Sequence, residues 1–399
     1  MLRRAIAGVF VTLLCSTSAT GGLPPQFPSP AIVPQACAAA WDESLLTSLV
    51  KPDEPGLAVY VHCAPQTSFL RTFGLRDPLR SRTSIDSATN FRLASLTKQF
   101  TAMAVMLLVH DGKLRYEQTL TSIWPDFPAY GKSITIRHLL QHTSGLPDYE
   151  DLMDTAESAK GQLWSPERQI QDREVLTLLK TADRGKFAPG SSWAYSNSGY
   201  VLLGLIVAKV SGIPYSNFLR TRIFAALGMD NTVAYVKGTN EVTNRAYGHT
   251  KVDDAFRETD QSSTSATLGD GGIYSNLIDL AKWDDAVRNY SLLAQDEMKV
   301  ALTPAVLRDG SQTLWPAAPS DDNLDPGRPV SYGFGWFLDP YRHHGLHPRM
   351  WHYGSTVGFR SRIERYTEQQ VTVIVLCNRT DLDPAKLAQK IADSYLAER

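Results

Sequence analysis

A serine and a lysine three residues apart stand at the head of an apolar stretch, FRLASLTKQFTAMAVMLL, which covers residues 91 to 108. If this stretch is a helix, both positions share a face, so the ammonium group of Lys98 can reach the hydroxyl of Ser95. A serine hydroxyl attacks a carbonyl carbon when a neighbouring base takes its proton, and lysine can act as that base. The free backbone N–H groups of a helix start can also face an oxyanion. The pair therefore predicts a nucleophilic serine with a basic partner.

The same spacing occurs a second time, at Ser48 and Lys51, where no long apolar helix follows. We interpret this second copy as a solvated helix end before the turn-forming sequence KPDEPG. Because the second copy has no predicted role, spacing alone leaves open that Lys98 is also an ordinary surface lysine. The choice depends on whether other reactive groups gather around Ser95.

The triplet Tyr-Ser-Asn provides a second set of reactive groups, and it occurs three times. Tyr195 and Asn197 follow a Pro-Gly turn in a stretch without helical or strand periodicity, where catalytic groups are over-represented. A tyrosine beside a nucleophilic serine can pass protons, and an amide can hold both a lysine and a substrate carbonyl. Packing and capping explain the other copies. Residues 215–217 follow a proline at a helix start, and residues 274–276 precede a helix in which Asp279 is the expected reciprocal capping partner.

Four histidines crowd into HHGLHPRMWHYGSTVGF, between residues 343 and 359. A metal site is the first hypothesis for such a cluster. However, neither a carboxylate nor a cysteine joins the histidines at a ligand spacing, and no H-E-x-x-H pattern occurs. We therefore predict neither a metal nor another cofactor. The stretch GSTVG imitates the nucleophile elbow of a different hydrolase class, but its central residue is Thr356 rather than serine.

The sequence His352-Tyr353-Gly354-Ser355 is predicted to begin a strand. Gly354 has no side chain, so a ligand can approach the backbone closely at that point. The backbone N–H of Ser355 can then donate to an oxyanion. His352 adds a polar side chain beside these groups, so this strand supplies the third candidate part of a site.

Strand-like runs lie near both ends of the chain, and helical patterns fill the middle. A hairpin is expected from LAVYVHC and SFLRTFGL, residues 57–63 and 68–75. The predicted late strands are YGFGWFL, FRSRIERY and VTVIVLC, followed by a final helix over residues 383–399. The helical patterns between them span residues 101–114, 135–146, 199–212 and 215–229.

This order predicts an α/β fold of two lobes: an antiparallel β-sheet flanked by helices and built from both chain ends, and an inserted, mostly helical lobe. We expect one domain over about residues 41–399. Its sheet lobe is expected to comprise about residues 41–110 and 330–399, and its helical lobe about residues 111–329. A pocket between two such lobes is a usual place for chemistry.

Three sets of residues in this order together resemble the motifs of the penicillin-recognising serine hydrolases. The sets are Ser95-x-x-Lys98, Tyr195-x-Asn197 and His352-x-Gly354. The likeness covers nearly all of residues 54 to 380 and is greatest to class C β-lactamases, DD-carboxypeptidases and related esterases. The resemblance implies a β-lactamase/transpeptidase-like fold, in agreement with the two lobes that the pattern predicts.

The resemblance also implies a role for each of these residues. Ser95 would attack a carbonyl carbon and form an acyl-enzyme, while Lys98 and Tyr195 would share the proton transfers. Asn197 would position the substrate. The backbone N–H groups of Ser95 and Ser355 would form the oxyanion hole.

His352 is a departure, because β-lactamases of this branch carry lysine at the corresponding position. A histidine there is similar to certain secreted DD-carboxypeptidases and family esterases, and we expect it to form a polar or positive wall of the pocket. Since histidine is only partly charged near pH 7, efficient β-lactamase activity is not expected. The expected activity is cleavage of a D-amino-acid peptide or a small ester. The alternative is a slow-acylating penicillin-binding or sensing module with little turnover.

Residues 1–19 are predicted to be an export signal, because Arg3 and Arg4 precede a short apolar run and a small residue, Ala19, offers a cleavage site. The run is shorter than the about 20 apolar residues that span a bilayer. The proline-rich residues 20–40 are expected to form an extended tether. The protein is therefore expected to be secreted or periplasmic, without stable membrane insertion.

The 40 basic and 41 acidic side chains leave no positive excess for binding nucleic acid. The expected partner is a small-molecule or peptide substrate, with peptidoglycan-derived peptides among the candidates. Removal of the signal leaves Cys37, Cys63 and Cys377, and this odd number indicates that the fold does not depend on a cysteine framework. Cys63 and Cys377 lie in predicted strands and are expected to be buried, with a disulfide between them as the open alternative.

Overall fold

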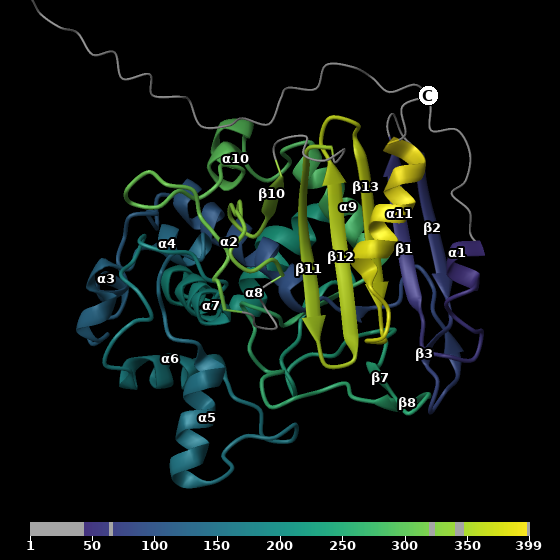
Figure 1. Cartoon of the computed structure of the whole chain (residues 1–399), viewed down its shortest axis with the longest axis horizontal. Helices are drawn as coiled ribbons and strands as arrows, with labels where there is room; N and C mark the ends of the chain where they lie inside the picture. Colours follow the sequence, from purple (N-terminus) through teal and green to yellow (C-terminus); the bar gives the residue numbers. More distant parts are fainter. Residues whose placement is uncertain (1–43, 64–66, 319–323, 340–346, 397–399) are drawn as a thin grey trace, which may run out of the picture.

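The computed structural model describes residues 44–63, 67–318, 324–339 and 347–396. The predicted signal peptide and the predicted tether lie outside these ranges, so both stay predictions. The described part contains one large antiparallel sheet with helices on both faces and a mostly helical lobe beside it (Figure 1). This is the two-lobed α/β architecture that the sequence predicts.

Strands from both ends of the chain form the six-stranded sheet, in the order β10-β11-β12-β13-β1-β2. β1 lies between β13 and β2, with Leu57 opposite both Cys377 and Phe73. All residues of β1 and β13 are buried, because helices cover both faces of the sheet. The predicted hairpin and the late strands predicted at FRSRIERY and VTVIVLC are therefore confirmed, whereas only the last two residues of the strand predicted at YGFGWFL belong to β10. The strands are β1 (Leu57–Cys63), β2 (Thr67–Phe73), β10 (Phe337–Asp339), β11 (Arg349–Thr356), β12 (Phe359–Tyr366) and β13 (Val371–Cys377).

Side chains of β13 alternate between two cores, as the pleat of a strand requires. Val373 and Val375 pack with the helices on the outer face of the sheet, where Figure 1 shows α11 in front of the strands. Ile374 and Leu376 belong to the main core, which the sheet shares with the helical lobe. The outer helices are α1 (Ser44–Thr47) and α11 (Pro384–Leu396), and the inner helices are α2 (Thr97–His110) and α9 (Leu277–Arg288).

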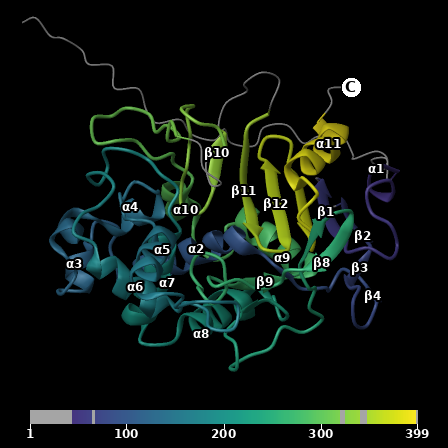
Figure 2. The same cartoon turned by 60° about the horizontal axis from the view of Figure 1, so that its bottom comes forward.

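The helical lobe lies to one side of the sheet, as the two views in Figures 1 and 2 agree, and α2 is buried between the two parts. Its helices are α3 (Leu120–Ile123), α4 (Ile136–Leu140), α5 (Tyr149–Lys160), α6 (Asp172–Thr181), α7 (Asn197–Ser211), α8 (Tyr215–Leu219) and α10 (Gln295–Ala301). Small ladders lie outside the six-stranded sheet. One consists of β5 (Phe91–Arg92), β9 (Ile273–Ser275) and β6 (Val233–Ala234). In addition, β3 (Leu75–Asp77) pairs with β4 (Thr83–Ser84), and β7 (His249–Val252) pairs with β8 (Ala255–Glu258).

No single helix within the described ranges is long and apolar enough to cross a bilayer. One pair, Asn197–Ser211 with Tyr215–Leu227, meets that criterion only when its two parts are taken together, and a bend of 77° separates them.

Two predicted helices are less regular than expected. Of residues 135–146 only α4 is helical, because the backbone turns away at His142, whose φ is +60°. Over residues 215–229, α8 continues into a π turn and a 3₁₀ turn that end at Gly228. Gly228 has a φ of +65°, a conformation that glycine adopts at low cost.

The start of α9 confirms one half of the predicted capping pair. Asn276 accepts a hydrogen bond from the backbone N–H of Asp279 at 3.0 Å. The expected reciprocal bond is wrong: the Asp279 carboxylate accepts from the hydroxyl of Thr232 at 2.9 Å and from the backbone N–H of Asn231, also at 2.9 Å.

The two strand cysteines are buried but lie at opposite ends of the β1–β13 pair. Cys63 faces Val371 across the ladder, whereas Cys377 faces Leu57. Cys377 is a free thiol, and burial raises its pKa to about 12. Cys63 is disulfide-bonded whereas Cys377 is free, so the alternative of a Cys63–Cys377 disulfide is excluded.

Candidate active site

Ser95 lies in a 3₁₀ turn, Ala94–Leu96, directly before α2. The helix itself begins at Thr97, two residues later than Ser95. Ala94 has a φ of +48°, which is uncommon for a residue with a side chain and stores strain of about 1–3 kcal/mol. The backbone N–H of Leu93 donates to the carbonyl of Ile273 at 2.8 Å and fixes the entry to the turn. The turn therefore holds the Ser95 hydroxyl in a defined position.

Lys98 is fully buried, and three hydrogen bonds fix its ammonium nitrogen. Nζ lies 2.9 Å from Ser95 Oγ, 2.8 Å from Asn197 Oδ1 and 3.1 Å from the backbone oxygen of Asp270. The two carbonyl oxygens can only accept hydrogen bonds, so they occupy two N–H groups. The third tetrahedral position of Nζ is thus directed at Ser95 Oγ. An ammonium group donates there, and a neutral amine accepts the serine proton.

The contrast with the second Ser-x-x-Lys copy is clear. Lys51 is exposed and pairs with Glu54 at 3.5 Å, as expected for a surface lysine. The open interpretation of Lys98 as a surface residue is therefore excluded by its burial.

Tyr195 and Asn197 stand at the start of α7, whose N-cap is Ser196. The Ser196 hydroxyl accepts from the backbone N–H of Gly199 at 3.1 Å. This cap positions Asn197 for its bond to Lys98. The ring of Tyr195 lies over Lys98, with 4.8 Å between Nζ and the ring centroid.

The other two tyrosine triplets have structural partners. Tyr215 donates to the hydroxyl of Thr101 on α2 at 2.5 Å. Tyr274 accepts a hydrogen bond from the guanidinium group of Arg245 at 3.0 Å. Of the three copies, the one at Tyr195 therefore contacts Lys98.

His142 is a site residue that the sequence did not single out. Its Nδ1 accepts from the backbone N–H of Ser196 at 3.1 Å, so the proton of the neutral ring is on Nε2. The ring lies 4.5 Å from that of Tyr195 and is fully buried. Burial, together with the charge of Lys98, holds its pKa well below 6.5. His142 is therefore a neutral ring that packs against Tyr195.

His352 lies in the middle of β11, which begins at Arg349 rather than at His352 as predicted. Its Nδ1 donates to the backbone oxygen of Tyr353 at 2.7 Å, so its Nε2 accepts from the hydroxyl of Tyr332 at 3.0 Å. The ring is fully buried, and burial beside Lys98 lowers its pKa to about 3. The partial positive charge expected from the sequence is therefore wrong, because the ring is neutral near pH 7.

Gly354 allows β11 to approach the turn that carries Ser95. A Cβ at this position would lie 2.1 Å from the backbone oxygen of Leu93 and 2.3 Å from the hydroxyl of Ser361. The sequence predicted close approach of a ligand at Gly354, whereas the structure shows close approach of the protein backbone. Ser355 follows Gly354 in β11, and its side chain is exposed. The predicted site residues thus come together from a turn, a helix start and a strand.

Asp270 adds a buried carboxyl group to this cluster. Its backbone oxygen accepts from Lys98, and its side chain is almost fully buried. Burial raises the pKa of the carboxyl group, while the charge of Lys98 opposes that rise.

Two of the four histidines, His343 and His344, lie outside the described residues, and within the described ranges no three potential ligands gather as a metal site.

Comparison with known proteins agrees with this geometry. The Beta-lactamase family model matches residues 43–396. Penicillin-binding protein 4* of Bacillus subtilis (strain 168) is 32% identical over 305 residues, which cover 73% of this chain and 61% of that protein. The D-alanyl-D-alanine-carboxypeptidase/endopeptidase AmpH of Escherichia coli (strain K12) is 30% identical over 57% of this chain and 56% of its own length. The chain thus spans about three fifths of the length of these curated relatives.

Solved structures share the fold. The D-amino acid amidase from Ochrobactrum anthropi SV3 superimposes with a TM-score of 0.64 at 25% identity, over 85% of this chain and 93% of the amidase. A penicillin binding protein from Bacillus halodurans gives a TM-score of 0.66 at 24% identity, over 84% of this chain and 94% of that chain. The β-lactamase/transpeptidase-like fold expected from the resemblance is therefore confirmed. With the family model matched over most of its length, the chain belongs to the beta-lactamase family.

Proposed function

We propose that this protein is a serine hydrolase that cleaves an amide or ester bond through an acyl-enzyme on Ser95. One observation carries the proposal: the fully buried Lys98 has two of its hydrogen-bonding positions occupied by carbonyl oxygens and the third directed at Ser95 Oγ. A lysine held in this way is placed to exchange a proton with that hydroxyl.

The proposed reaction has two halves. In the first, Ser95 Oγ forms a bond to the substrate carbonyl carbon, and Lys98 Nζ takes the hydroxyl proton. The backbone N–H groups of Ser95 and Ser355 stabilise the oxyanion, and the leaving amine or alcohol departs with a proton passed through Lys98 and Tyr195. In the second half, water attacks the acyl carbon, gives up a proton through the same groups and releases the acid from Ser95.

The neutral state of His352 supports a substrate that needs no carboxylate anchor at this position. A lysine would offer a permanent charge to a carboxylate, whereas an imidazole with a pKa of about 3 offers only dipoles. We therefore favour amides and esters of D-amino acids over β-lactams and peptides with a free terminal carboxylate. The names of two similar proteins, a D-aminopeptidase of Cereibacter sphaeroides and the D-amino acid amidase, support this choice.

A slow-acylating penicillin-binding or sensing module is the second candidate. The relative named Penicillin-binding protein 4* favours it. The two candidates differ in deacylation: a hydrolase turns over, whereas a sensor keeps its acyl group.

One experiment separates them. The purified protein is incubated with a fluorescent penicillin, a nitrophenyl ester, D-phenylalanine amide and a peptide ending in D-Ala-D-Ala, and both protein mass and product are followed. We expect turnover of the ester and the amide, and stable labelling without turnover would favour the sensor instead. Ser95→Ala should abolish labelling and turnover, while Ser48→Ala, in the second Ser-x-x-Lys copy, should change neither. Retained activity in Ser95→Ala would refute the proposed mechanism.

We also propose that the protein is exported and that its signal is cleaved near Ala19. The basic start and short apolar run of residues 1–19 support this. The disulfide at Cys63 adds support, because disulfides persist mainly in oxidising compartments. The N-terminal sequence of the protein recovered from the cell envelope or the medium tests this proposal.

A further inference from the structure

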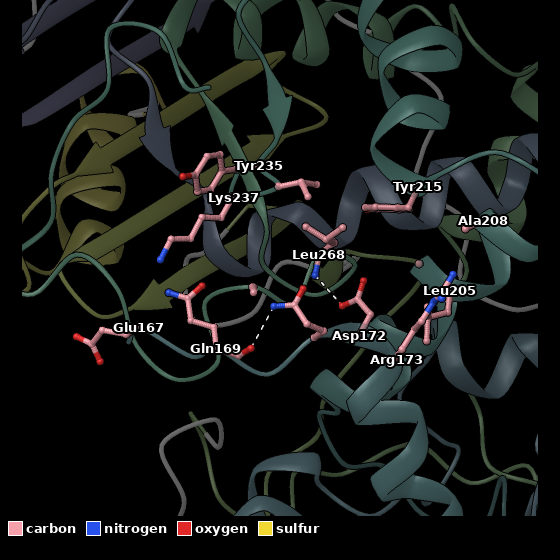
Figure 3. A pocket seen from close by; sticks show the side chains of 14 residues that line it. Glu167, Gln169, Asp172, Arg173, Leu205, Ala208, Tyr215, Tyr235, Lys237 and Leu268 are labelled. Atoms are coloured by element: carbon pink, nitrogen blue, oxygen red, sulfur yellow. Dashed lines mark hydrogen bonds between the residues drawn. The ribbon is translucent and has the colours of Figure 1, made fainter. Parts of the chain in front are cut away.

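A cavity of about 440 Å³ lies beside α6, α7 and α8, and none of its lining residues belongs to the cluster around Ser95. Figure 3 shows the side chains that line it. Its apolar surface comes from Leu205, Ala208, Tyr215, Tyr235 and Leu268. A volume of this size accommodates a small organic molecule.

Asp172 is less exposed than the other charged groups that line this cavity. It is half-buried at the first position of α6, and one carboxylate oxygen accepts from the backbone N–H of Leu268 at 3.0 Å (Figure 3). Among the described residues no ion pair involves Asp172. The other charged lining residues, Glu167, Arg173 and Lys237, are exposed, so water screens them. The cavity therefore combines an apolar wall with one half-buried carboxylate.

We propose that this cavity binds a small organic ammonium ion, whose charge pairs with Asp172 and whose apolar body packs against Leu205, Ala208 and Leu268. A ligand that covers the half-buried Asp172 removes its carboxylate from water, which is costly unless a cation compensates the charge, and the ammonium group supplies that cation. The apolar wall contributes through the surface that the ligand removes from water. Neither Asp172 nor the apolar wall takes part in the proposed hydrolytic mechanism, so this cavity is a second site.

The protonation of Asp172 gives the site a pH dependence. Burial raises the pKa of Asp172 to about 7, and the neighbouring carboxyl group of Asp270 adds to that rise. Tyr215 faces Asp172 from α8 with a phenol whose pKa is raised far above 10, and Arg173 and Lys237 stand at the rim. An ammonium ion binds the ionised carboxylate, so its affinity should rise with pH. From the ionised fractions we expect about tenfold tighter binding at pH 8 than at pH 6.

Three consecutive residues connect this cavity to Lys98. The N–H of Leu268 donates to Asp172, the carbonyl of Gly269 accepts from the hydroxyl of Thr101 at 2.6 Å, and the carbonyl of Asp270 accepts from Lys98. The segment has little room to move, because a Cβ at Gly269 would lie 2.2 Å from the backbone oxygen of Tyr200. We therefore expect a ligand at Asp172 to act on the position of Lys98 through residues 268–270.

The test uses three probes that share an indole ring: tryptamine, its neutral analogue tryptophol and the anion indole-3-propionate. Isothermal titration at pH 8 should show saturable binding of tryptamine and at least tenfold weaker binding of the other two. Asp172→Asn keeps an acceptor for Leu268 and should lose the preference for tryptamine and its pH dependence. Asp296→Asn, which removes an exposed aspartate from the first turn of α10, is the matched control and should change neither.

A second variant and a second readout complete the test. Ala208→Leu fills part of the cavity and should weaken tryptamine binding without changing its pH dependence. Saturating tryptamine should slow hydrogen exchange over residues 264–272 in the native protein, a result that does not depend on the proposed hydrolase activity. Equal affinity for the three probes, or full tryptamine affinity in Asp172→Asn, would overturn the site. Unchanged exchange over residues 264–272 at saturation would overturn its connection to Lys98.

Discussion

Replacement of His352 by glutamine tests the neutral, buried imidazole that distinguishes this site. In the folded protein the pKa of His352 is about 3, against 6.5 for an ordinary histidine. Between these values the unfolded chain binds a proton at this position and the folded chain does not. Stability therefore falls as pH drops below about 6.5 and is retained above it. His352→Gln should remove this contribution to the pH dependence of the free energy of unfolding.

The magnitude follows from linkage. From pH 7 to pH 5 the proton uptake of an unfolded histidine changes the free energy by about 2 kcal/mol, while a group with a pKa of about 3 contributes almost nothing. Other buried histidines, including His142, also make the folded protein less stable in acid. Because they are present in both proteins, their contributions cancel in the comparison. The wild type should therefore lose about 2 kcal/mol more than His352→Gln over this range.

Urea unfolding followed by tryptophan fluorescence at pH 7, 6 and 5 measures the difference directly. His110→Gln, which removes an exposed imidazole that pairs with Glu297, controls for the loss of a surface histidine. Equal pH dependence of the wild type and His352→Gln would show that His352 takes up its proton in the folded state. That result would also remove the reason for favouring substrates without a carboxylate.

Three further replacements test the site and the core. Lys98→Ala should slow ester turnover by about 10⁴-fold in steady-state kinetics while substrate still binds, and a loss below about tenfold would make Lys98 a bystander. Gly354→Ala should lower the free energy of unfolding in urea by about 1–3 kcal/mol and slow acylation of Ser95, because its Cβ would lie 2.1 Å from the Leu93 carbonyl oxygen. Asp284→Ala removes the carboxylate that accepts from Nε of the buried Arg365 at 2.6 Å. The loss should lower the free energy of unfolding by about 3–5 kcal/mol in thermal unfolding, and a decrease below about 1 kcal/mol would contradict the buried pair.

Features encoded in local pattern were predictable from the sequence. The apolar runs at residues 57–63 and 371–377 predicted strands, and the structure shows both as neighbouring strands inside the sheet. The long apolar helix after Ser95 distinguished the buried Lys98 from the exposed Lys51, although both share one spacing. Residue types and their context were sufficient in these cases.

Features that depend on backbone atoms or on burial were not predictable. Asp270 holds Lys98 through a carbonyl oxygen, which every residue type carries. His142 acts as a neutral ring because the fold buries it, and its left-handed backbone also ends the helix predicted over residues 135–146. Likewise, His352 is neutral because the fold buries it beside Lys98, a residue far away in the chain.

The pairing of β1 with β13 sets an order of events in folding. Its partners, such as Leu57 and Cys377, are separated by nearly the whole domain, so we expect this pair to form late in folding. Closing a loop of this length is entropically unfavourable until the intervening part of the chain has become compact. A chain still emerging from the ribosome therefore lacks a finished catalytic centre until β11, which carries His352 and Gly354, has been made.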